Sequence, residues 1–304
     1  MARILVCDPI AAEAVEALRR EGHEVVEKPG MTPEQLLETV PGFTAIVVRS
    51  ATKVTRPVLE KAAGTLKLVV RGGVGMDNID AAAAKEFGVD VMNTPGASSI
   101  AVAELAMAHL LACCRFITRA DRTCKEGKWE KKAFSKGREL WNSTLGLVGF
   151  GRIAREVAKR ALAFDMKVVY YDPFVEGTSD LPVRKVDLES LCRTSDFISL
   201  HIPFSAETKH LLGEQQFGMM KQGTVIVNCA RGGVVNEPAL LEAIKSGKVF
   251  AAGLDVFEQE PPSGSELVAS DQVVATPHIG AGTEGATARV GGEVVKIVSE
   301  YFRK

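Results

Sequence analysis

Short runs of aliphatic and β-branched residues alternate with stretches of helical periodicity along most of the chain. Alternation of this kind favours parallel sheets whose crossover helices cover both faces. The pattern falls into two consecutive blocks that meet near residue 98. We therefore predict an α/β protein with two doubly wound parallel-sheet domains.

The first block contains the apolar runs of one α/β unit. Its strands are predicted at Arg3–Cys7, Glu24–Val26, Ala45–Val48, Leu68–Val70 and Val89–Met92. Helices are predicted between them, near residues 10–20, 33–39, 55–63 and 79–87. We expect this unit to have a flavodoxin-like sheet.

The second block follows a predicted helix at 98–118 and a polar, aromatic connection at 125–140. Its six strands are predicted at Thr144–Val148, Lys167–Tyr171, Phe197–Leu200, Thr224–Asn228, Ala251–Leu254 and Val273–Ala275. Helices are predicted near residues 152–163, 187–192, 214–219 and 237–246. Six strands with helical crossovers indicate a Rossmann-type nucleotide-binding sheet.

The terminal segment 284–302 repeats apolar residues at helical spacing, so one face of that helix should pack on a core. The second sheet already has its strands by this point, and we predict that the helix returns to the first domain. The expected domains are 1–97 with 282–304, which binds substrate, and 98–281, which binds a nucleotide.

Composition indicates a globular protein that acts on small molecules. The chain has 304 residues, of which 46% are hydrophobic and 25% charged, with a net charge of -1. This balance gives no general attraction to nucleic acid or to anionic lipid. The apolar stretch 100–114 is shorter than the ~20 residues of a membrane span and contains Glu104 and His109. We expect a buried helix there, and neither a nucleic-acid nor a membrane partner.

The six cysteines lack Cys-x-x-Cys pairs and histidines at zinc-site intervals. Free thiols and no metal site are expected, which is typical of a reducing, cytoplasmic compartment. The N-terminal segment has too short an apolar run for a signal peptide and is predicted to be the first strand.

A glycine pattern follows the strand that ends at Val148. Gly149 permits a tight turn, Gly151 lets the backbone approach a pyrophosphate, and Ala154 keeps the next helix close to the strand. The amides at the start of that helix would then face the phosphates. Asp172 ends the following strand, where a carboxylate can bind ribose hydroxyls and would repel a 2′-phosphate. The predicted cofactor is therefore NAD, in preference to NADP.

Three residues in the last third of the chain point to reduction of a 2-keto acid. Arg231 follows a strand, and its planar guanidinium can hold a substrate carboxylate while polarising the keto oxygen. His278 also follows a strand and can exchange the hydroxyl proton. Glu260, fixed by two prolines, can set the imidazole tautomer and stabilise its charged form. The other four histidines and Glu258 are expected to be structural.

The first block adds two candidate anion sites. Arg49, Ser50 and Lys53 supply two cations and a hydroxyl after a strand, which suits a phosphate or a second carboxylate. The segment Arg71–Gly75 follows the next strand, and its glycines free backbone amides to bind an anion. A solvated loop is as good an interpretation of the first segment on spacing alone.

The motifs taken together resemble one known family over essentially the whole chain. They include the segments VRSATKVT, GVGMDNID, MNTPG, LGLVGFGRIA, VNCARGG, LDVFEQEPP and TPHIG. The sequence is similar to the D-isomer-specific 2-hydroxyacid dehydrogenases, and most closely to members that oxidise 3-phospho-D-glycerate to 3-phosphohydroxypyruvate at the entry to serine synthesis.

The resemblance implies roles for individual residues. Catalytic positions would be Arg231, Glu260 and His278. Cofactor contacts would come from Gly149, Gly151, Arg152, Ile153, Asp172, Ile202, Pro203, Cys229, Ala230, Asp255 and Gly280. Substrate would be bound by Arg49, Ser50, Lys53, Gly72, Gly73 and Val74, where Val74 departs from the threonine that is common in close relatives.

The same resemblance implies a homodimer formed through the helix 98–118 and the connection around Trp129. It also leads us to expect no serine feedback, because the regulatory domain that many relatives append is missing. Three alternatives remain open: a glyoxylate or hydroxypyruvate reductase, an NAD-sensing corepressor-type binding protein, and a formate or phosphite dehydrogenase.

Overall fold

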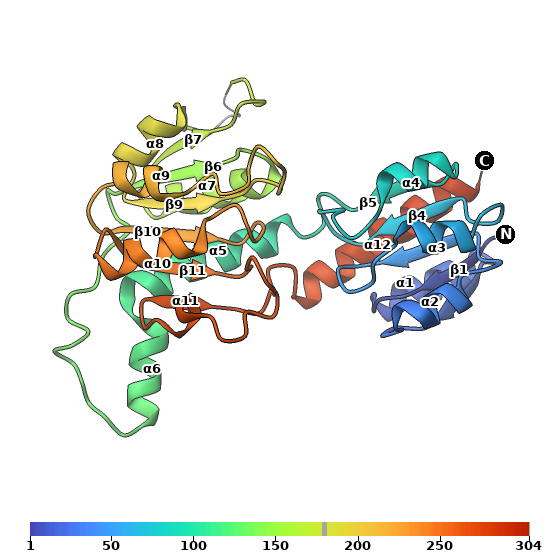
Figure 1. The fold of residues 1–304 in the computed structure, drawn as a ribbon, viewed down its shortest axis with the longest axis horizontal. Coiled ribbons are helices and arrows are strands. Elements are labelled where there is room, and N and C mark those ends of the chain that lie inside the picture. Colours follow the sequence, from blue (N-terminus) through green and yellow to red (C-terminus); the bar gives the residue numbers. More distant parts are fainter. Residues whose placement is uncertain (178–180, 304) are drawn as a thin grey trace. The chain divides into compact units, whose positions relative to one another are not determined.

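A computed structural model of the chain describes residues 1–177 and 181–303. The chain forms two compact units, one made of residues 1–101 and those from 281 on, the other of residues 102–280. We call them unit 1 and unit 2. Both contain a parallel sheet covered by helices (Figure 1), as the alternating pattern predicts.

Unit 1 has a five-stranded parallel sheet in the order β2-β1-β3-β4-β5. This is the flavodoxin-like order, and it confirms the predicted fold class. The strands are β1 (Arg3–Val6), β2 (Glu24–Glu27), β3 (Ala45–Val48), β4 (Leu68–Arg71) and β5 (Asp90–Asn93). Each lies within one or two residues of its predicted position.

Strand residues of unit 1 alternate between two cores because successive side chains point to opposite faces of a sheet. Ile4 and Val6 pack against α1 (Ala12–Arg20) and α12 (Glu284–Phe302). Leu5 and Cys7 pack on the opposite face. That face is covered by the three remaining helices of the unit, α2 (Pro33–Thr39), α3 (Arg56–Lys61) and α4 (Ala81–Glu86).

Unit 2 has a seven-stranded parallel sheet in the order β12-β11-β10-β9-β6-β7-β8. Its strands are β6 (Thr144–Val148), β7 (Lys167–Tyr171), β8 (Arg184–Lys185), β9 (Phe197–Leu200), β10 (Thr224–Asn228), β11 (Val249–Leu254) and β12 (Val273–Ala275). The six predicted strands are all present. The two-residue edge strand β8 was not predicted, because both of its residues are exposed and polar and give no hydrophobic signal.

Helices cover both faces of the unit 2 sheet. One face is covered by α5 (Ser99–Arg115) and α7 (Arg152–Ala163), and the other by α8 (Leu188–Thr194), α9 (Glu214–Met219) and α10 (Glu237–Lys245). The four-residue helix α11 (Glu266–Ala269) lies before β12. The sheet order reverses beside β6, and ligands of open α/β sheets bind at the carboxyl ends of strands at such a point.

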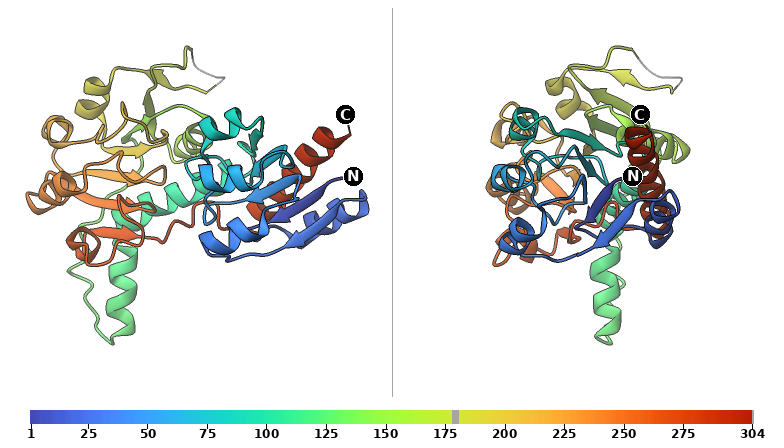
Figure 2. Two further views of the ribbon diagram at one scale, coloured as in Figure 1. Left: turned by 45° about the vertical axis from the view of Figure 1, so that its right-hand side comes forward. Right: turned by 90° about the vertical axis from the view of Figure 1, so that its right-hand side faces the viewer.

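The prediction of a single helix at 98–118 is wrong, because the helix is interrupted at Phe116. That residue has a left-handed φ of 55°, and the axes of α5 and of α6 (Ile117–Lys125) differ by 64°. No residue of α6 is buried, and Figure 2 shows this helix projecting away from the sheet of unit 2. Among the described helices none is long and apolar enough to cross a membrane alone, and only the bent α5–α6 pair reaches that length.

Candidate active site

The turn after β6 requires glycine at its first position. Gly149 has a φ of 89°, and a Cβ there would lie 2.6 Å from the carbonyl oxygen of His201 and 2.7 Å from a methyl group of Ile202. Gly151, by contrast, has no heavy atom within 4 Å of the position of a Cβ. It stands at the N-cap of α7 without a side-chain cap. The predicted turn therefore leaves an open approach to the first amides of α7, at Arg152 and Ile153, and fits a dinucleotide pyrophosphate.

Asp172 is held at the end of β7 by backbone amides. Its Oδ2 accepts a hydrogen bond from Phe150 N at 2.8 Å, which ties the carboxylate to the glycine turn. Its Oδ1 accepts from Phe174 N at 2.8 Å and Val175 N at 3.1 Å. The carboxylate is thus fixed beside the turn, as recognition of a ribose requires.

The loops after β9 and β10 carry further predicted cofactor residues. Ile202 lies against the glycine turn, and the carbonyl of Pro203 accepts a hydrogen bond from Thr208 Oγ1 at 2.8 Å. Cys229 and Ala230 are buried, and burial raises the pKa of the Cys229 thiol above its usual range, so the thiol stays protonated.

Arg231 is positioned by the last residue of β10. Asn228 donates from Nδ2 to the carbonyl of Arg231 at 2.9 Å and accepts at Oδ1 from Ala230 N at 3.0 Å. The guanidinium donates from Nη1 to the carbonyl of Ala230 at 2.7 Å. The buried Asn228 therefore shapes the turn that presents Arg231, a role that sequence reasoning missed.

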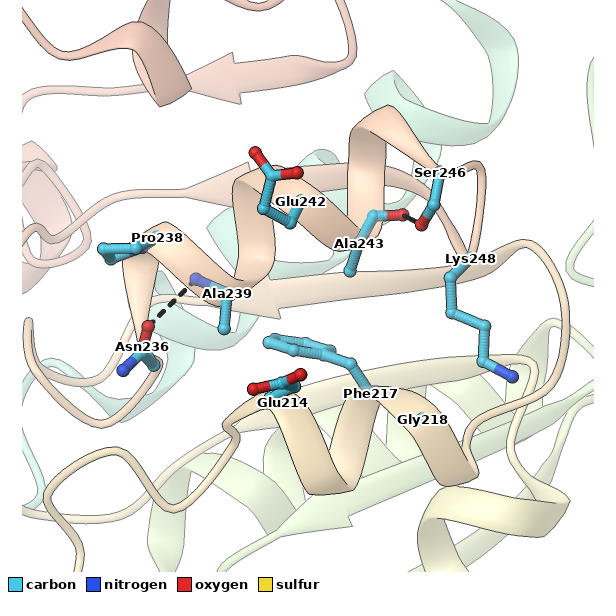
Figure 3. A pocket seen from close by; sticks show the side chains of 10 residues that line it. All are labelled: Glu214, Phe217, Gly218, Asn236, Pro238, Ala239, Glu242, Ala243, Ser246 and Lys248. Atoms are coloured by element: carbon cyan, nitrogen blue, oxygen red, sulfur yellow. Dashed lines mark hydrogen bonds between the residues drawn. The ribbon is translucent and has the colours of Figure 1, made fainter.

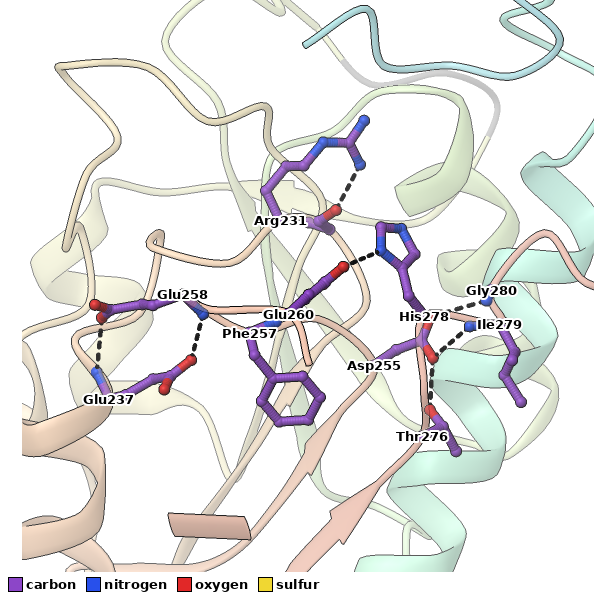
Figure 4. A network of polar contacts seen from close by, with 11 residues as sticks. Arg231, Glu237, Asp255, Phe257, Glu258, Glu260, Thr276, His278, Ile279 and Gly280 are labelled. Carbon is purple, nitrogen blue, oxygen red and sulfur yellow. Dashed lines mark hydrogen bonds and ion pairs between the residues drawn. The ribbon is translucent and has the colours of Figure 1, made fainter. Parts of the chain in front are cut away.

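Glu260 and His278 form the hydrogen-bonded pair that the sequence predicts. His278 Nδ1 lies 2.9 Å from Glu260 Oε2, and Glu260 Oε1 accepts from Phe257 N at 3.2 Å. Figure 4 shows the side chain of Arg231 beside the Glu260–His278 pair, on the side on which the imidazole of His278 lies. The His278 side chain is 42% exposed, so its ring remains accessible to a ligand. The structure thus brings the three predicted catalytic side chains together within unit 2.

Asp255 holds the loop that carries His278. Its Oδ1 accepts from Ile279 N at 2.8 Å and from Thr276 Oγ1 at 2.6 Å, and its Oδ2 accepts from Gly280 N at 2.8 Å. His278 itself has a φ of 55°, a conformation that non-glycine residues rarely adopt. Because Asp255 grips the chain on both sides of His278, it keeps this backbone in place. The sequence predicted Asp255 as a cofactor contact and did not indicate this second role.

In unit 1, the loop after β3 is held by two side chains that sequence reasoning missed. The buried Asp8 accepts hydrogen bonds from Arg49 N at 2.5 Å and from Thr52 Oγ1 at 2.7 Å. Asn78 donates from Nδ2 to the carbonyls of Arg49 and Thr52, at 2.8 and 2.6 Å. With its backbone fixed, the loop presents the exposed Ser50 and Lys53 and the half-buried Arg49.

The glycine loop after β4 approaches both Arg49 and helix α12. A Cβ on Gly72 would lie 3.5 Å from Arg49 Cγ and 3.0 Å from Val290 Cγ1. Gly73 has a φ of 149°, and the Arg71 guanidinium fills the space where its Cβ would stand. Val74 is 37% exposed. Unit 1 therefore places Arg49 next to the predicted glycine loop.

A second histidine–glutamate pair, besides that of His278 with Glu260, is formed by His210 and Glu258. His210 Nε2 lies 3.1 Å from Glu258 Oε1, and Glu258 N donates to Glu237 Oε1 at 2.6 Å. Burial and the nearby Glu258 raise the pKa of Glu237. In the described part of the chain, no group of three or more His, Cys, Asp or Glu residues is arranged to hold a metal ion.

A surface groove lies away from these residues. It runs between α9 and α10, with Phe217 at its floor and Glu214 and Lys248 at its edges (Figure 3). None of the predicted catalytic or cofactor residues lines it, so it does not belong to the site described above.

Comparison with known proteins decides the family. A family model described as the NAD binding domain of D-isomer specific 2-hydroxyacid dehydrogenases matches residues 107–280. The chain belongs to this family. It is 52% identical to hydroxypyruvate reductase of Thermotoga maritima, over 97% of this chain and 96% of that relative. It is 47% identical to D-3-phosphoglycerate dehydrogenase of Methanocaldococcus jannaschii, over 100% of this chain but 58% of that longer relative.

Solved structures agree with this placement. D-lactate dehydrogenase from Aquifex aeolicus, complexed with NAD and lactic acid, is 32% identical, with a TM-score of 0.86 over 99% of this chain and 95% of that one. The protein is accordingly an NAD-dependent D-2-hydroxyacid dehydrogenase, and unit 2 is its Rossmann-like NAD-binding domain. The narrower expectation of a 3-phosphoglycerate substrate stays a prediction, because relatives of both kinds match.

Proposed function

We propose that this dehydrogenase interconverts 3-phospho-D-glycerate and 3-phosphohydroxypyruvate. The observation that supports this choice of substrate is the presence of two cationic side chains, Arg49 and Lys53, in one loop of unit 1. No side chain in the described part of the chain forms an ion pair with Arg49 or Lys53, although the backbone around them is fixed by Asp8 and Asn78. Cations whose loop is held in place and that form no ion pair with the described residues are suited to a dianionic phosphate.

The other end of the substrate would be bound by residues of the common family chemistry. The Arg231 guanidinium would hold the substrate carboxylate, with a further N–H directed at the keto oxygen. The backbone amides of Gly73 and Val74 would supply a further set of donors for a carboxylate. Both roles need an acid with oxygen at carbon 2, so they support the reaction class without selecting the substrate.

Proton transfer would be carried out by His278. In oxidation, Nε2 takes the hydroxyl proton, because Nδ1 is engaged with Glu260. Glu260 then stabilises the imidazolium that forms, and in reduction the same imidazolium returns the proton to the developing alkoxide. NAD, when bound, supplies the chemistry of hydride transfer. Gly149, Gly151 and Asp172 would hold it, and the open N-terminus of α7 fits its pyrophosphate.

A second candidate function is reduction of hydroxypyruvate, with glyoxylate as a related substrate. One observation favours it: the Thermotoga maritima relative carries that name and matches along nearly its whole length. The catalytic residues would be the same, since both substrates share the keto acid. The two functions differ only in whether a phosphate is recognised by unit 1.

Initial rates separate the two candidates. We expect kcat/KM with NADH to be highest for 3-phosphohydroxypyruvate, compared with hydroxypyruvate and glyoxylate, and to be lower with NADPH. Arg49→Gln should remove the preference for the phosphorylated acid, lowering its kcat/KM about 10- to 100-fold while changing hydroxypyruvate reduction little. Arg56→Gln is the matched control, since Arg56 is already paired with Glu86 at 2.8 Å. A chain that prefers hydroxypyruvate regardless of Arg49 would be a hydroxypyruvate reductase.

The expected assembly and location belong to the same proposal. A homodimer would cover the apolar side chains exposed on α6 and the following connection, which include Ile117, Trp129 and Trp141. Light scattering in solution should then give twice the chain mass of 32.6 kDa. The free cysteines and a role at the entry to serine synthesis fit a cytoplasmic enzyme.

A further inference from the structure

A fully buried histidine lies behind the loop that carries His278. His109 is on α5, is 2% exposed, and packs against β11 so closely that a Cβ on Gly253 would lie 2.6 Å from its own. Its Nε2 is 3.0 Å from Thr276 Oγ1. Thr276 is the first residue of the Thr-Pro-His-Ile-Gly segment, two positions before His278.

The direction of each hydrogen bond follows from the donors available. The Thr276 hydroxyl donates its one proton to Asp255 Oδ1, at 2.6 Å. It can therefore only accept from His109, which must carry its proton on Nε2. The remaining nitrogen, Nδ1, is buried and has no hydrogen-bond partner, so the ring is neutral with an unused lone pair. A charged His109 would leave a buried N–H without an acceptor, and burial does lower the pKa of this residue.

A continuous series of hydrogen bonds thus runs from the buried His109 through the half-buried Thr276 to the buried Asp255. Asp255 in turn accepts hydrogen bonds from the amides of Ile279 and Gly280, which follow His278 in the sequence. The left-handed backbone of His278 is costly and persists only where its surroundings fix it. In addition to these side-chain hydrogen bonds, the segment that carries His278 is anchored to β11 by the hydrogen bond from Thr276 N to the Leu254 carbonyl at 2.9 Å.

We propose that His109 and Thr276 are positioning residues for catalysis, which orient Asp255 and thereby the loop that presents His278. His109 supplies the proton that saturates the Thr276 hydroxyl, so that this hydroxyl points toward Asp255 and toward no other acceptor. The inference rests on the proposed role of His278 as the residue that exchanges the substrate proton.

Paired substitutions of nearly equal volume test the hydrogen bond apart from the packing. His109→Met and Thr276→Val remove one donor each, and we expect each to lower kcat about 10- to 100-fold, a larger loss than the accompanying loss of NADH affinity. His109→Gln places an amide donor where Nε2 stands, and Thr276→Ser keeps the hydroxyl, so both should retain most of kcat. Because the residues act in one chain, the double variant His109→Met with Thr276→Val should be no slower than the slower single variant.

The measurements use whichever 2-keto acid the unaltered enzyme reduces fastest, so a wrong substrate assignment leaves the test intact. Full activity of His109→Met and Thr276→Val, losses that add in the double variant, or an equal loss in His109→Gln and His109→Met would overturn the proposal. Nitrogen NMR of the unaltered chain gives a readout independent of turnover: His109 should stay neutral and protonated on Nε2 from about pH 6 to 8. Protonation on Nδ1, or titration in that range, would contradict it. Near-normal turnover of His278→Ala would instead refute the proposed function itself.

Discussion

His278 shows how much of a catalytic residue's behaviour is decided by its neighbours. Its ring is oriented by Glu260, whose other oxygen is held by the amide of Phe257. Its backbone is held in a left-handed conformation by the contacts of Asp255. The free ring nitrogen is thereby directed outward in a fixed tautomer, which is the arrangement that repeated proton exchange requires.

At this scale we predict that His278→Ala lowers kcat about 100-fold or more, since it removes general acid–base catalysis. Binding of NADH, measured by fluorescence titration, should be retained, because the turn at Gly149 and Asp172 is unaffected. His210→Ala is the matched control: His210 also pairs with a glutamate, at 3.1 Å, and also has a positive φ, of 53°. If both variants lose turnover equally, the loops depend on any His–Glu pair and His278 has no special role.

Sequence patterns anticipated the site unevenly, and the reason is physical. Arg231, Glu260 and His278 each follow a strand, and the carboxyl ends of parallel strands meet at one edge of a sheet, so their proximity was predictable. The hydrogen bonds by which Asp8 holds the Arg49 loop and Asp255 holds the His278 loop were not predictable. Each joins residues more than 20 positions apart through contacts that only tertiary packing defines. The pairing of His210 with Glu258 was missed for the same reason.

At the scale of elements, two loops of the site are in direct backbone contact. A Cβ on Gly232 would lie 1.8 Å from the carbonyl oxygen of Phe257 and 2.8 Å from Glu258 N. The loop after β10, which carries Arg231, can therefore approach the loop after β11, which carries Glu260, only if residue 232 has no side chain. Gly232 thus sets the separation of these two catalytic groups.

We predict that Gly232→Ala lowers kcat about 10- to 100-fold, because backbone atoms must move apart and displace Arg231 relative to Glu260. The added methyl group should also reduce the free energy of unfolding by about 1–3 kcal/mol, measured by urea denaturation. Gly218→Ala in α9 serves as the control, since nothing lies within 4 Å of its Cβ position. Unchanged turnover of Gly232→Ala would show that the two loops move independently of this contact.

The elements themselves were predictable wherever periodicity was strong. Helix α12 was predicted at 284–302 and spans the same residues, Glu284–Phe302, in the structure. The break between α5 and α6 was missed because Phe116 is an ordinary hydrophobic residue in an apolar stretch, and nothing in its type indicates a left-handed φ.

At the scale of the molecule, unit 1 is made from both ends of the chain. Helix α12 places Val290, Val294 and Val298 in the same core as Ile4 and Val6 of β1. Helix α12 packs closely against α1 because residue 291 is a glycine. A Cβ at that position would lie only 2.9 Å from the Cβ of Ala14, which is too close. The stability of unit 1 therefore depends on contacts made by the last residues of the chain.

Tyr301 is one such contact, and it should make the stability of unit 1 sensitive to alkaline pH. Its hydroxyl lies 2.8 Å from Asp90 Oδ2 and 3.0 Å from the Lys67 carbonyl oxygen, next to β5 and β4, and donates its single proton to the carboxylate as the stronger acceptor. Burial, the hydrogen bond to Asp90 and the charge of that carboxylate raise the pKa of Tyr301 to about 12. An unfolded tyrosine has a pKa of about 10.

Because the folded pKa is the higher one, the contribution of Tyr301 to stability is complete below about pH 10 and is lost progressively between about pH 10 and 12. Tyr301→Phe removes the contribution at every pH, so it should be less stable than the unaltered chain at pH 8. The difference in free energy of unfolding between the two chains should then shrink as the pH rises from about 10 to 11. Denaturation curves of both chains across this range provide the measurement, and the difference cancels the titration of every other group. A difference that stayed constant with pH would mean that the Tyr301 hydroxyl is not held by Asp90 in solution.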